Sequence, residues 1–148
     1  MATLFLDPNA FLSEHLTDEA ALGATADDPA AVGHVHLSVG DAATARAFYA
    51  DTMGFDVTAS LGNQAVFVSA GGYHHHMAMN VWNSRGAGPR MPALGLGRVD
   101  LVLPDDDALG ALGERLRDRG VPVRDDGRTV TFDDPWNNVL HAGVSGRG

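Results

Sequence analysis

Six of the seven histidines fall in three places in the chain, and they are the residues best suited to chemistry. His34 and His36 alternate with aliphatic residues, and a strand turns alternate side chains to the same face. Residues 74–76 are three consecutive histidines, and His141 lies near the end of the chain. Imidazole binds transition metals and carries protons near neutral pH. The pattern therefore indicates a metal site or an acid–base site assembled from several strands.

These histidines sit in a pattern that occurs twice. Residues 33–55 read as a strand, a turn and a helix, and the same pattern begins again at Gly97. Asp41 and Asp105 are placed to cap the two helices, and Gly54 and Gly120 to end them. Each helix is followed by three short alternating segments. The sequence predicts an α+β fold of two tandem βαβββ modules, which form a curved mixed sheet around a cleft. The expected strands are 34–39, 55–61, 64–70, 74–82, 98–103, 121–124, 128–132 and 139–144.

Alternation along these strands predicts which side chains face the cleft. Met77, Met79 and Val81 should face the helices, and so should His75. We therefore expect His76→Ala to lower ligand or metal affinity and His75→Ala to change little. Convergent polar groups on a concave surface are the usual sign of a ligand site. The side chains expected to face inward are His34, His36, His74, His76, Ala78, Asn80, Arg98, Asp100 and His141.

The domain organisation follows from composition. Residues 1–32 read as an N-terminal arm: Asp7-Pro8 can begin a short helix over 9–15, and 20–31 is a linker rich in Ala, Asp and Gly. Residues 33–148 form the main domain. Its parts are module one at 33–83, a Gly- and Pro-rich connector at 84–96, and module two at 97–148.

Charge and composition exclude several classes of function. The formal net charge of −9 argues against a nucleic-acid partner, because binding phosphates needs a basic surface. With no cysteine, the chain has neither disulfides nor thiolate ligands. No signal peptide or membrane-spanning run is visible in the sequence, so a cytoplasmic protein without a membrane partner is expected.

The tandem modules resemble the vicinal oxygen chelate superfamily of glyoxalases, bleomycin-resistance proteins and extradiol dioxygenases. The resemblance rests on Gly33-His34, Ala47-Phe48-Tyr49 with Gly54-Phe55, and Asp134-Pro135 through Asn138. Gly-His-Val-His-Leu and Ser69-Ala-Gly-Gly-Tyr-His-His-His resemble the catechol-2,3-dioxygenase-like branch. The resemblance implies a divalent metal ion (Fe, Mn, Zn or Ni), and a histidine on the fourth strand that acts as acid and base, for which His76 is the match.

The metal ligands that the resemblance implies are not all present. The first falls on His34, the second on Arg98, which cannot bind a metal, and the third, usually a glutamate, on His141. The usual site of two histidines and one carboxylate is therefore not intact. A shifted site is expected, formed by His34 or His36 with His76, His141 or Asp100.

Three functions remain open at this point. The first is a metal-dependent enzyme, ring-cleaving or glyoxalase-like, on a small oxygenated substrate, for which an aromatic compound is one option. The second is a metal-free protein that binds a small molecule or an antibiotic, as bleomycin-resistance proteins do. The third is half of an ancestral two-domain protein. Arg98, Asp100 and Asn80 are candidate ligand-binding residues in each case, although Arg98 and Asp100 also fit a structural ion pair. A homodimer is expected.

Overall fold

The computed structural model describes residues 6–15 and 33–145, and it divides the chain into two compact units at Gly33. The first unit contains α1 (Pro8–His15), which confirms the predicted helix. The Asp7 carboxylate accepts hydrogen bonds from the backbone N–H groups of Asn9 and Ala10, at 2.9 and 3.2 Å. The predicted linker at 20–31 lies outside the described residues. Within the described ranges, no helix is both long and apolar enough to cross a membrane.

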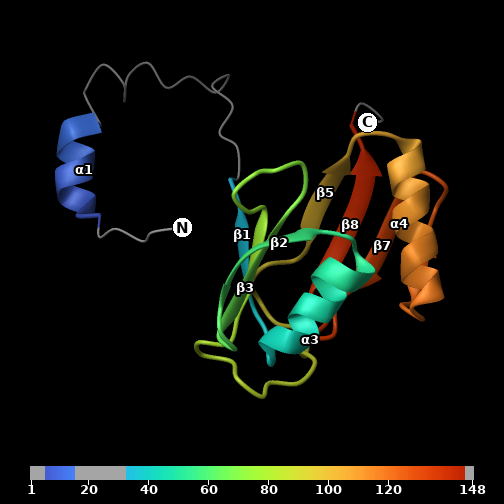
Figure 1. Ribbon diagram of the computed structural model, residues 1–148, viewed down its shortest axis with the longest axis horizontal. Helices are drawn as coiled ribbons and strands as arrows, with labels where there is room; N and C mark the ends of the chain where they lie inside the picture. Colours follow the sequence, from blue (N-terminus) through green and yellow to red (C-terminus); the bar gives the residue numbers. More distant parts are fainter. Residues whose placement is uncertain (1–5, 16–32, 146–148) are drawn as a thin grey trace. The chain divides into compact units, whose positions relative to one another are not determined.

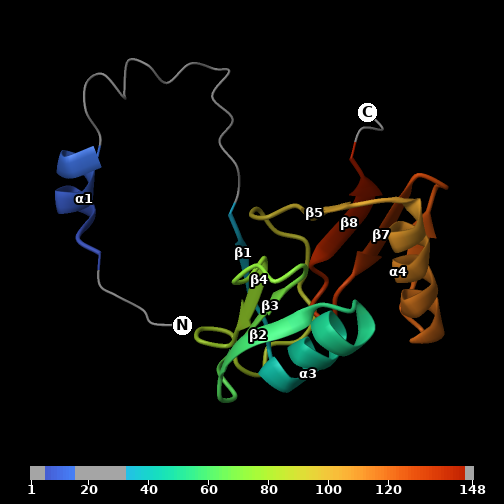
Figure 2. The same ribbon diagram turned by 45° about the horizontal axis from the view of Figure 1, so that its top comes forward.

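The second unit begins with the first module, which contains four strands and one helical segment. Helix α3 (Ala42–Arg46) continues directly as a π-helical segment, η1 (Ala47–Thr52). Asp41 caps α3, because its carboxylate accepts from the Thr44 N–H at 2.7 Å. In space the strands run β1-β4-β3-β2, with β1 and β4 parallel and the other pairs antiparallel (Figure 2). The strands are β1 (Val35–Ser38), β2 (Asp56–Leu61), β3 (Ala65–Ser69) and β4 (Met77–Asn80).

The second module repeats this arrangement. Helix α4 (Asp106–Asp118) is capped by Asp105, whose carboxylate accepts from the Ala108 N–H at 2.8 Å. Figure 1 shows α4 alongside β7 and β8. The strands run β5-β8-β7-β6, again with the first pair parallel. They are β5 (Val99–Leu103), β6 (Val123–Asp125), β7 (Thr129–Asp133) and β8 (Val139–Val144). The predicted α+β class and the two tandem modules are confirmed.

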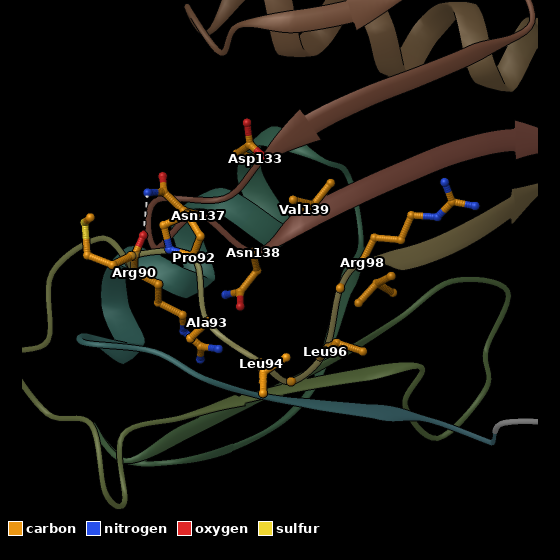
Figure 3. Close-up of a pocket in the computed structure, with 14 residues that line it drawn as sticks. Arg90, Pro92, Ala93, Leu94, Leu96, Arg98, Asp133, Asn137, Asn138 and Val139 are labelled. Atoms are coloured by element: carbon orange, nitrogen blue, oxygen red, sulfur yellow. Dashed lines mark hydrogen bonds between the residues drawn. The ribbon is translucent and has the colours of Figure 1, made fainter.

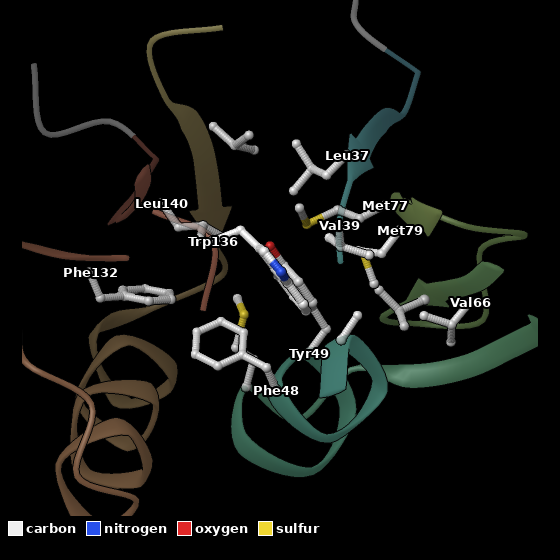
Figure 4. Close-up of a cluster of buried hydrophobic side chains, with 14 of the residues drawn as sticks. Leu37, Val39, Phe48, Tyr49, Val66, Met77, Met79, Phe132, Trp136 and Leu140 are labelled. Carbon is white, nitrogen blue, oxygen red and sulfur yellow. The ribbon is translucent and has the colours of Figure 1, made fainter. Parts of the chain in front are cut away.

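One face of each sheet packs with the helical segments into a shared hydrophobic core (Figure 4). Burying a large apolar side chain contributes roughly 1.5–3 kcal/mol, so this core dominates the stability of the unit. Because side chains alternate along a strand, the opposite face of each sheet is left for other residues. The core includes Leu37, Val39, Phe48, Tyr49, Val66, Val68, Met77, Met79, Leu109, Leu112, Leu116, Phe132, Trp136, Leu140 and Ala142.

A buried carboxylate joins the two modules. Asp134 follows β7 and accepts hydrogen bonds from the backbone N–H groups of Trp136 and Asn138, both at 2.8 Å. It also accepts from the Asn138 side-chain amide at 2.7 Å and from the Tyr49 hydroxyl at 2.8 Å. Burial, followed by the charge of Asp134, raises the pKa of Tyr49, so the hydroxyl stays protonated and remains a donor.

The connector is anchored where β1 ends. The Gly86 N–H donates to the Gly40 carbonyl at 2.8 Å, and the Trp136 indole N–H donates to the Ala87 carbonyl at 3.0 Å. A Cβ atom on Gly40 would lie 2.1 Å from the Ala87 oxygen, so only glycine allows this approach. Arg90 donates from its side chain to the Ser38 carbonyl at 2.7 Å.

Candidate functional site

Three histidines come together on the face of the first sheet that is turned away from the core. Each of His34, His36 and His75 offers a ring nitrogen, and these three atoms lie within 4.8 Å of one another. The ring centroids of His34 and His75 are 4.4 Å apart, and those of His34 and His36 are 5.0 Å apart. In the part of the chain that the structure describes, this is the one group of histidine and acidic residues found able to hold a metal ion.

The first two histidines are positioned by the alternation of β1. Val35 and Leu37 pack into the core or against it, so His34 and His36 must point to the opposite face. His36 pairs with Ala78 of β4 in the parallel register. Its ring lies 6.1 Å from that of Phe67 on β3, which is on the same face. The strand therefore fixes two of the three ring positions.

His75 is not positioned by strand alternation, and the expectation that it faces the helices is wrong. The ladder of β4 begins only at Met77, so the strict alternation of a strand does not extend back to residue 75. A turn at Gly71 and Gly72, with φ of 66° and 77°, comes before it. The segment is attached to the sheet through the backbone of His76, whose N–H donates to the Val68 carbonyl at 2.9 Å.

His75 is surrounded by aromatic rings, those of His34, His74 and Phe67, and its own ring nitrogens lack hydrogen-bond partners. Its side chain lies against Phe67, with ring centroids 5.2 Å apart, and the residue is only 6% exposed. Neither ring nitrogen has a hydrogen-bond partner among the described residues. A buried polar group without a partner costs about 1–3 kcal/mol, so a metal ion or a water molecule bound at these nitrogens would stabilise the arrangement.

Electrostatics favour the neutral form of two of these imidazoles, His36 and His75. Burial lowers the pKa of His75, and the neighbouring histidines, His34 foremost, lower it further. The pKa of His36 is also lowered, first by burial and then by His34. A metal binds the neutral form of imidazole, so these shifts favour a metal over protons. A set of three imidazole ligands suits Zn, Fe, Ni or Cu.

The other candidates on the first sheet lie outside this group. His76 is engaged elsewhere: its Nδ1 lies 2.9 Å from the Ser69 hydroxyl and accepts from the Ala70 N–H at 3.3 Å. His74 is exposed and packs edge-on against the rings of His75 and Tyr73. Asn80 is buried at the end of β4. The sequence offered one signal for His75, the run of three histidines after Gly-Gly, but not the identity of the one that turns inward.

The candidates on the second sheet form a separate cluster. Arg98 donates from Nε to the Asp100 carboxylate at 3.1 Å, so the expected ion pair is present. The Nδ1 atom of His141 lies 3.0 Å from the same carboxylate. Asp100 of β5 and His141 of β8 are direct partners in the parallel register. His141 is thus placed beside a carboxylate rather than in the group of three histidines.

A cavity of about 560 Å³ lies between the connector and the start of β5 and β8, in the size range of small-molecule sites (Figure 3). Its wall includes the apolar residues Met91, Leu94 and Leu96, all exposed. Asn138 and the Arg90 side chain project into it in Figure 3. The clustered histidines are not among its lining residues.

Comparisons with known proteins agree with this architecture. The model of the family described as "Glyoxalase/Bleomycin resistance protein/Dioxygenase superfamily" matches residues 31–141. A catechol-2,3-dioxygenase of Bacillus subtilis (strain 168) is 40% identical over 106 residues. The match covers 70% of this chain but only 37% of the relative's length.

Solved structures share the fold at low identity. A lactoylglutathione lyase from Agrobacterium tumefaciens aligns with a TM-score of 0.60 at 23% identity, over 80% of this chain and 96% of that one. A glyoxalase/bleomycin resistance protein/dioxygenase from Alicyclobacillus acidocaldarius aligns with a TM-score of 0.56 at 17% identity, over 80% and 93% of the two chains. At these identities the likeness concerns the fold alone.

Proposed function

Because this chain belongs to the glyoxalase/bleomycin resistance protein/dioxygenase superfamily, we propose that it is a metal-dependent enzyme that cleaves a small aromatic substrate with two adjacent oxygen atoms. One observation carries the proposal. His75 is buried with both ring nitrogens unpartnered, and it lies beside His34 and His36. The 40% identity to a catechol-2,3-dioxygenase supports ring cleavage as the reaction, although the chain spans only 37% of that relative's length.

The three histidines would hold the metal, and they fit it. Their nitrogens already lie within 4.8 Å of one another, and burial favours the neutral form of His36 and His75. A bound divalent metal would supply a Lewis acid for the two oxygens of the substrate and a centre for dioxygen chemistry. Phe67 covers one side of the group with an apolar ring, which limits access of water to His75.

The proposed site departs from the one that the family resemblance implies. Arg98 takes the place of the second family ligand, and its guanidinium, which pairs with Asp100, cannot bind a metal. The third ligand is His75 in place of a residue of the last strand. A catalytic role of His76 as acid and base stays a prediction, since its Nδ1 is already engaged with Ser69 and Ala70.

The test is turnover of catechol probes by protein made without a histidine tag and loaded anaerobically with Fe(II) or Mn(II). Ring cleavage is followed by the absorbance of the product, for wild type, His75→Ala and His74→Ala. His74 is the matched control, because it is the adjacent histidine and is exposed. We expect metal-dependent cleavage that falls by more than about 100-fold in His75→Ala, since even outer partners of metal ligands are worth about 10- to 100-fold. Equal rates for all three proteins would refute the site.

A second candidate function is metal-free binding of a small molecule, and the cavity of about 560 Å³ beside the connector favours it. Its apolar wall and the side chains of Arg90 and Asn138 offer both hydrophobic and polar contacts. This function requires that a chelator leave ligand affinity unchanged. Equilibrium dialysis of catechol probes, with and without a chelator, separates the two functions.

A further inference from the structure

We propose that the cavity beside the connector is a binding site for a small organic carboxylate, and that Arg90 is the residue that recognises the anion. The inference goes beyond the metal-dependent reaction, because none of the three clustered histidines lines this cavity. It gives the ligand a charge and a chemical class, and it holds whether or not the histidines bind a metal.

Arg90 is anchored both at its backbone and at its guanidinium. Its backbone N–H donates to the Trp136 carbonyl at 3.0 Å, and its carbonyl accepts from the Asn137 side-chain amide at 3.0 Å (Figure 3). At the other end, the guanidinium donates to the Ser38 carbonyl at 2.7 Å. A side chain that is already ordered loses little further conformational entropy when a ligand binds, so Arg90 is preorganised for binding.

The carbonyl that Arg90 contacts lies on the free edge of β1. The Val39 N–H donates across to the Asn80 carbonyl of β4 at 2.8 Å. In a trans peptide the carbonyl of one residue and the N–H of the next point in opposite directions, so the Ser38 carbonyl points away from β4. This bond uses one of the guanidinium donors, and the others remain for an anion.

Arg90 carries the unbalanced charge in the lining of the cavity. The other charged residues of the lining are Arg98, which pairs with Asp100 at 3.0 Å, and Asp133, which pairs with Arg124 at 2.7 Å. Among the described residues, no ion pair involves Arg90. An arginine without an acidic partner attracts an anion, and its planar guanidinium matches the geometry of a carboxylate.

The charge of the whole chain favours an anion with a single negative charge. The formal net charge is −9, so the protein as a whole repels anions, and one unpaired arginine compensates one charge. A phosphate group carries a charge of about −1.5 to −2 near neutral pH and would need more cations than this lining offers. A carboxylate therefore fits the cavity better than a phosphate.

The rest of the lining indicates what else the ligand carries. Met91, Leu94 and Leu96 expose apolar side chains, and an apolar body packed against them would remove that surface from water. Asn138 is buried, and its amide nitrogen donates to the Asp134 carboxylate at 2.7 Å. The amide oxygen of Asn138 is left as an acceptor on the cavity side, so it suits a ligand with a hydroxyl donor.

The first experiment uses the tag-free wild type with a chelator present, and calorimetry with 4-hydroxyphenylacetate. This probe has a carboxylate, an apolar ring and a single phenol, so it lacks the two adjacent oxygens that a metal would chelate. We expect it to bind at least about 10-fold more tightly than 4-hydroxyphenylacetamide, the uncharged analogue, because hydrogen bonds to charged groups are strong. Phenylacetate, which lacks the hydroxyl, should bind about threefold more weakly than the probe.

Three results with the wild type would overturn the proposal. The first is equal affinity for the acid and the amide. The second is competition by inorganic phosphate as strong as that by the acid. The third is no binding of the acid at millimolar concentration, as expected if a second copy of the chain fills the cavity.

The second experiment locates the probe with variants. We expect Arg90→Gln to lower the affinity for the acid by about 10- to 100-fold, down to that of the amide. The matched control is Arg85→Gln, because Arg85 also donates to a backbone carbonyl, that of Asn63, but does not line the cavity. Its affinity should equal that of the wild type.

A second pair of variants does not depend on the anchoring role of Arg90. Leu94→Asp places a negative charge on an exposed wall residue, where it cannot disturb the core, and should weaken binding of the acid by about 10-fold. Val102→Asp adds the same charge at an exposed residue outside the lining and should change little. Full affinity in either Arg90→Gln or Leu94→Asp contradicts the proposal.

Failure of the proposed function gives a different result. With the chelator present, His75→Ala should bind the acid as the wild type does. If the wild type binds the acid but cleaves no catechol when loaded with metal, the ring-cleaving function fails and the carboxylate site stands. If the affinity for the acid falls in His75→Ala and not in Arg90→Gln, the probe binds at the histidines and the carboxylate site is overturned.

Discussion

The hydrogen bond between Tyr49 and Asp134 joins the two modules, and its loss should destabilise the protein measurably. Tyr49 is fully buried, and its hydroxyl donates to the Asp134 carboxylate at 2.8 Å. Hydrogen bonds to charged groups are worth about 1.5–3 kcal/mol. Tyr49→Phe removes the donor while Asn138 still donates to the same carboxylate oxygen, at 2.7 Å. We therefore expect a loss of about 2 kcal/mol in the free energy of unfolding.

The assay is urea unfolding followed by circular dichroism, with the slope of the transition compared between variants. Tyr73→Phe is the control, because Tyr73 is exposed and its hydroxyl makes no hydrogen bond in the described structure. A double-mutant cycle with Asp134→Asn should show coupling between the two positions. A loss below about 0.5 kcal/mol in Tyr49→Phe, the range of ordinary surface substitutions, would refute the reasoning.

Three further predictions concern the stability of the chain and its assembly. Gly40→Ala should destabilise by about 1–3 kcal/mol in urea, because its Cβ would collide with the Ala87 carbonyl, whereas Gly88→Ala, with open space around it, should change little. Tyr49 has its pKa raised above the ordinary 10.0, so the free energy of unfolding should fall as pH rises above 10.0, and a pH series should show a smaller fall in Tyr49→Phe. The chain should be a dimer at micromolar concentration, and light scattering that gives a monomer mass would contradict this.

Local patterns were enough to predict the elements that carry the site. The period of two, extended one residue back from the start of β1 at Val35, places His34 and His36 together on one face. The helix caps at Asp41 and Asp105 were likewise readable, because a cap bonds the backbone only three residues away.

The third histidine could not be predicted in this way. Whether His75 or His76 joins the group depends on where the β4 ladder begins, and that is set by pairing with β1 and β3. The alternation of β4 does not extend to His75, two residues before Met77, where the strand begins. The contact of His141 with Asp100 similarly depends on a parallel pairing between strands that are distant in sequence.

The central claim is that His34, His36 and His75 hold a metal, and a calorimetric titration tests it most directly. Tag-free wild type, His75→Ala and His76→Ala are titrated with Zn(II), which does not oxidise, at about pH 8, well above the ordinary imidazole pKa of about 6.5. The account predicts one metal per wild-type chain, an affinity lowered by about 100-fold or more in His75→Ala, and little change in His76→Ala. Weakened binding in His76→Ala with full affinity in His75→Ala would contradict it.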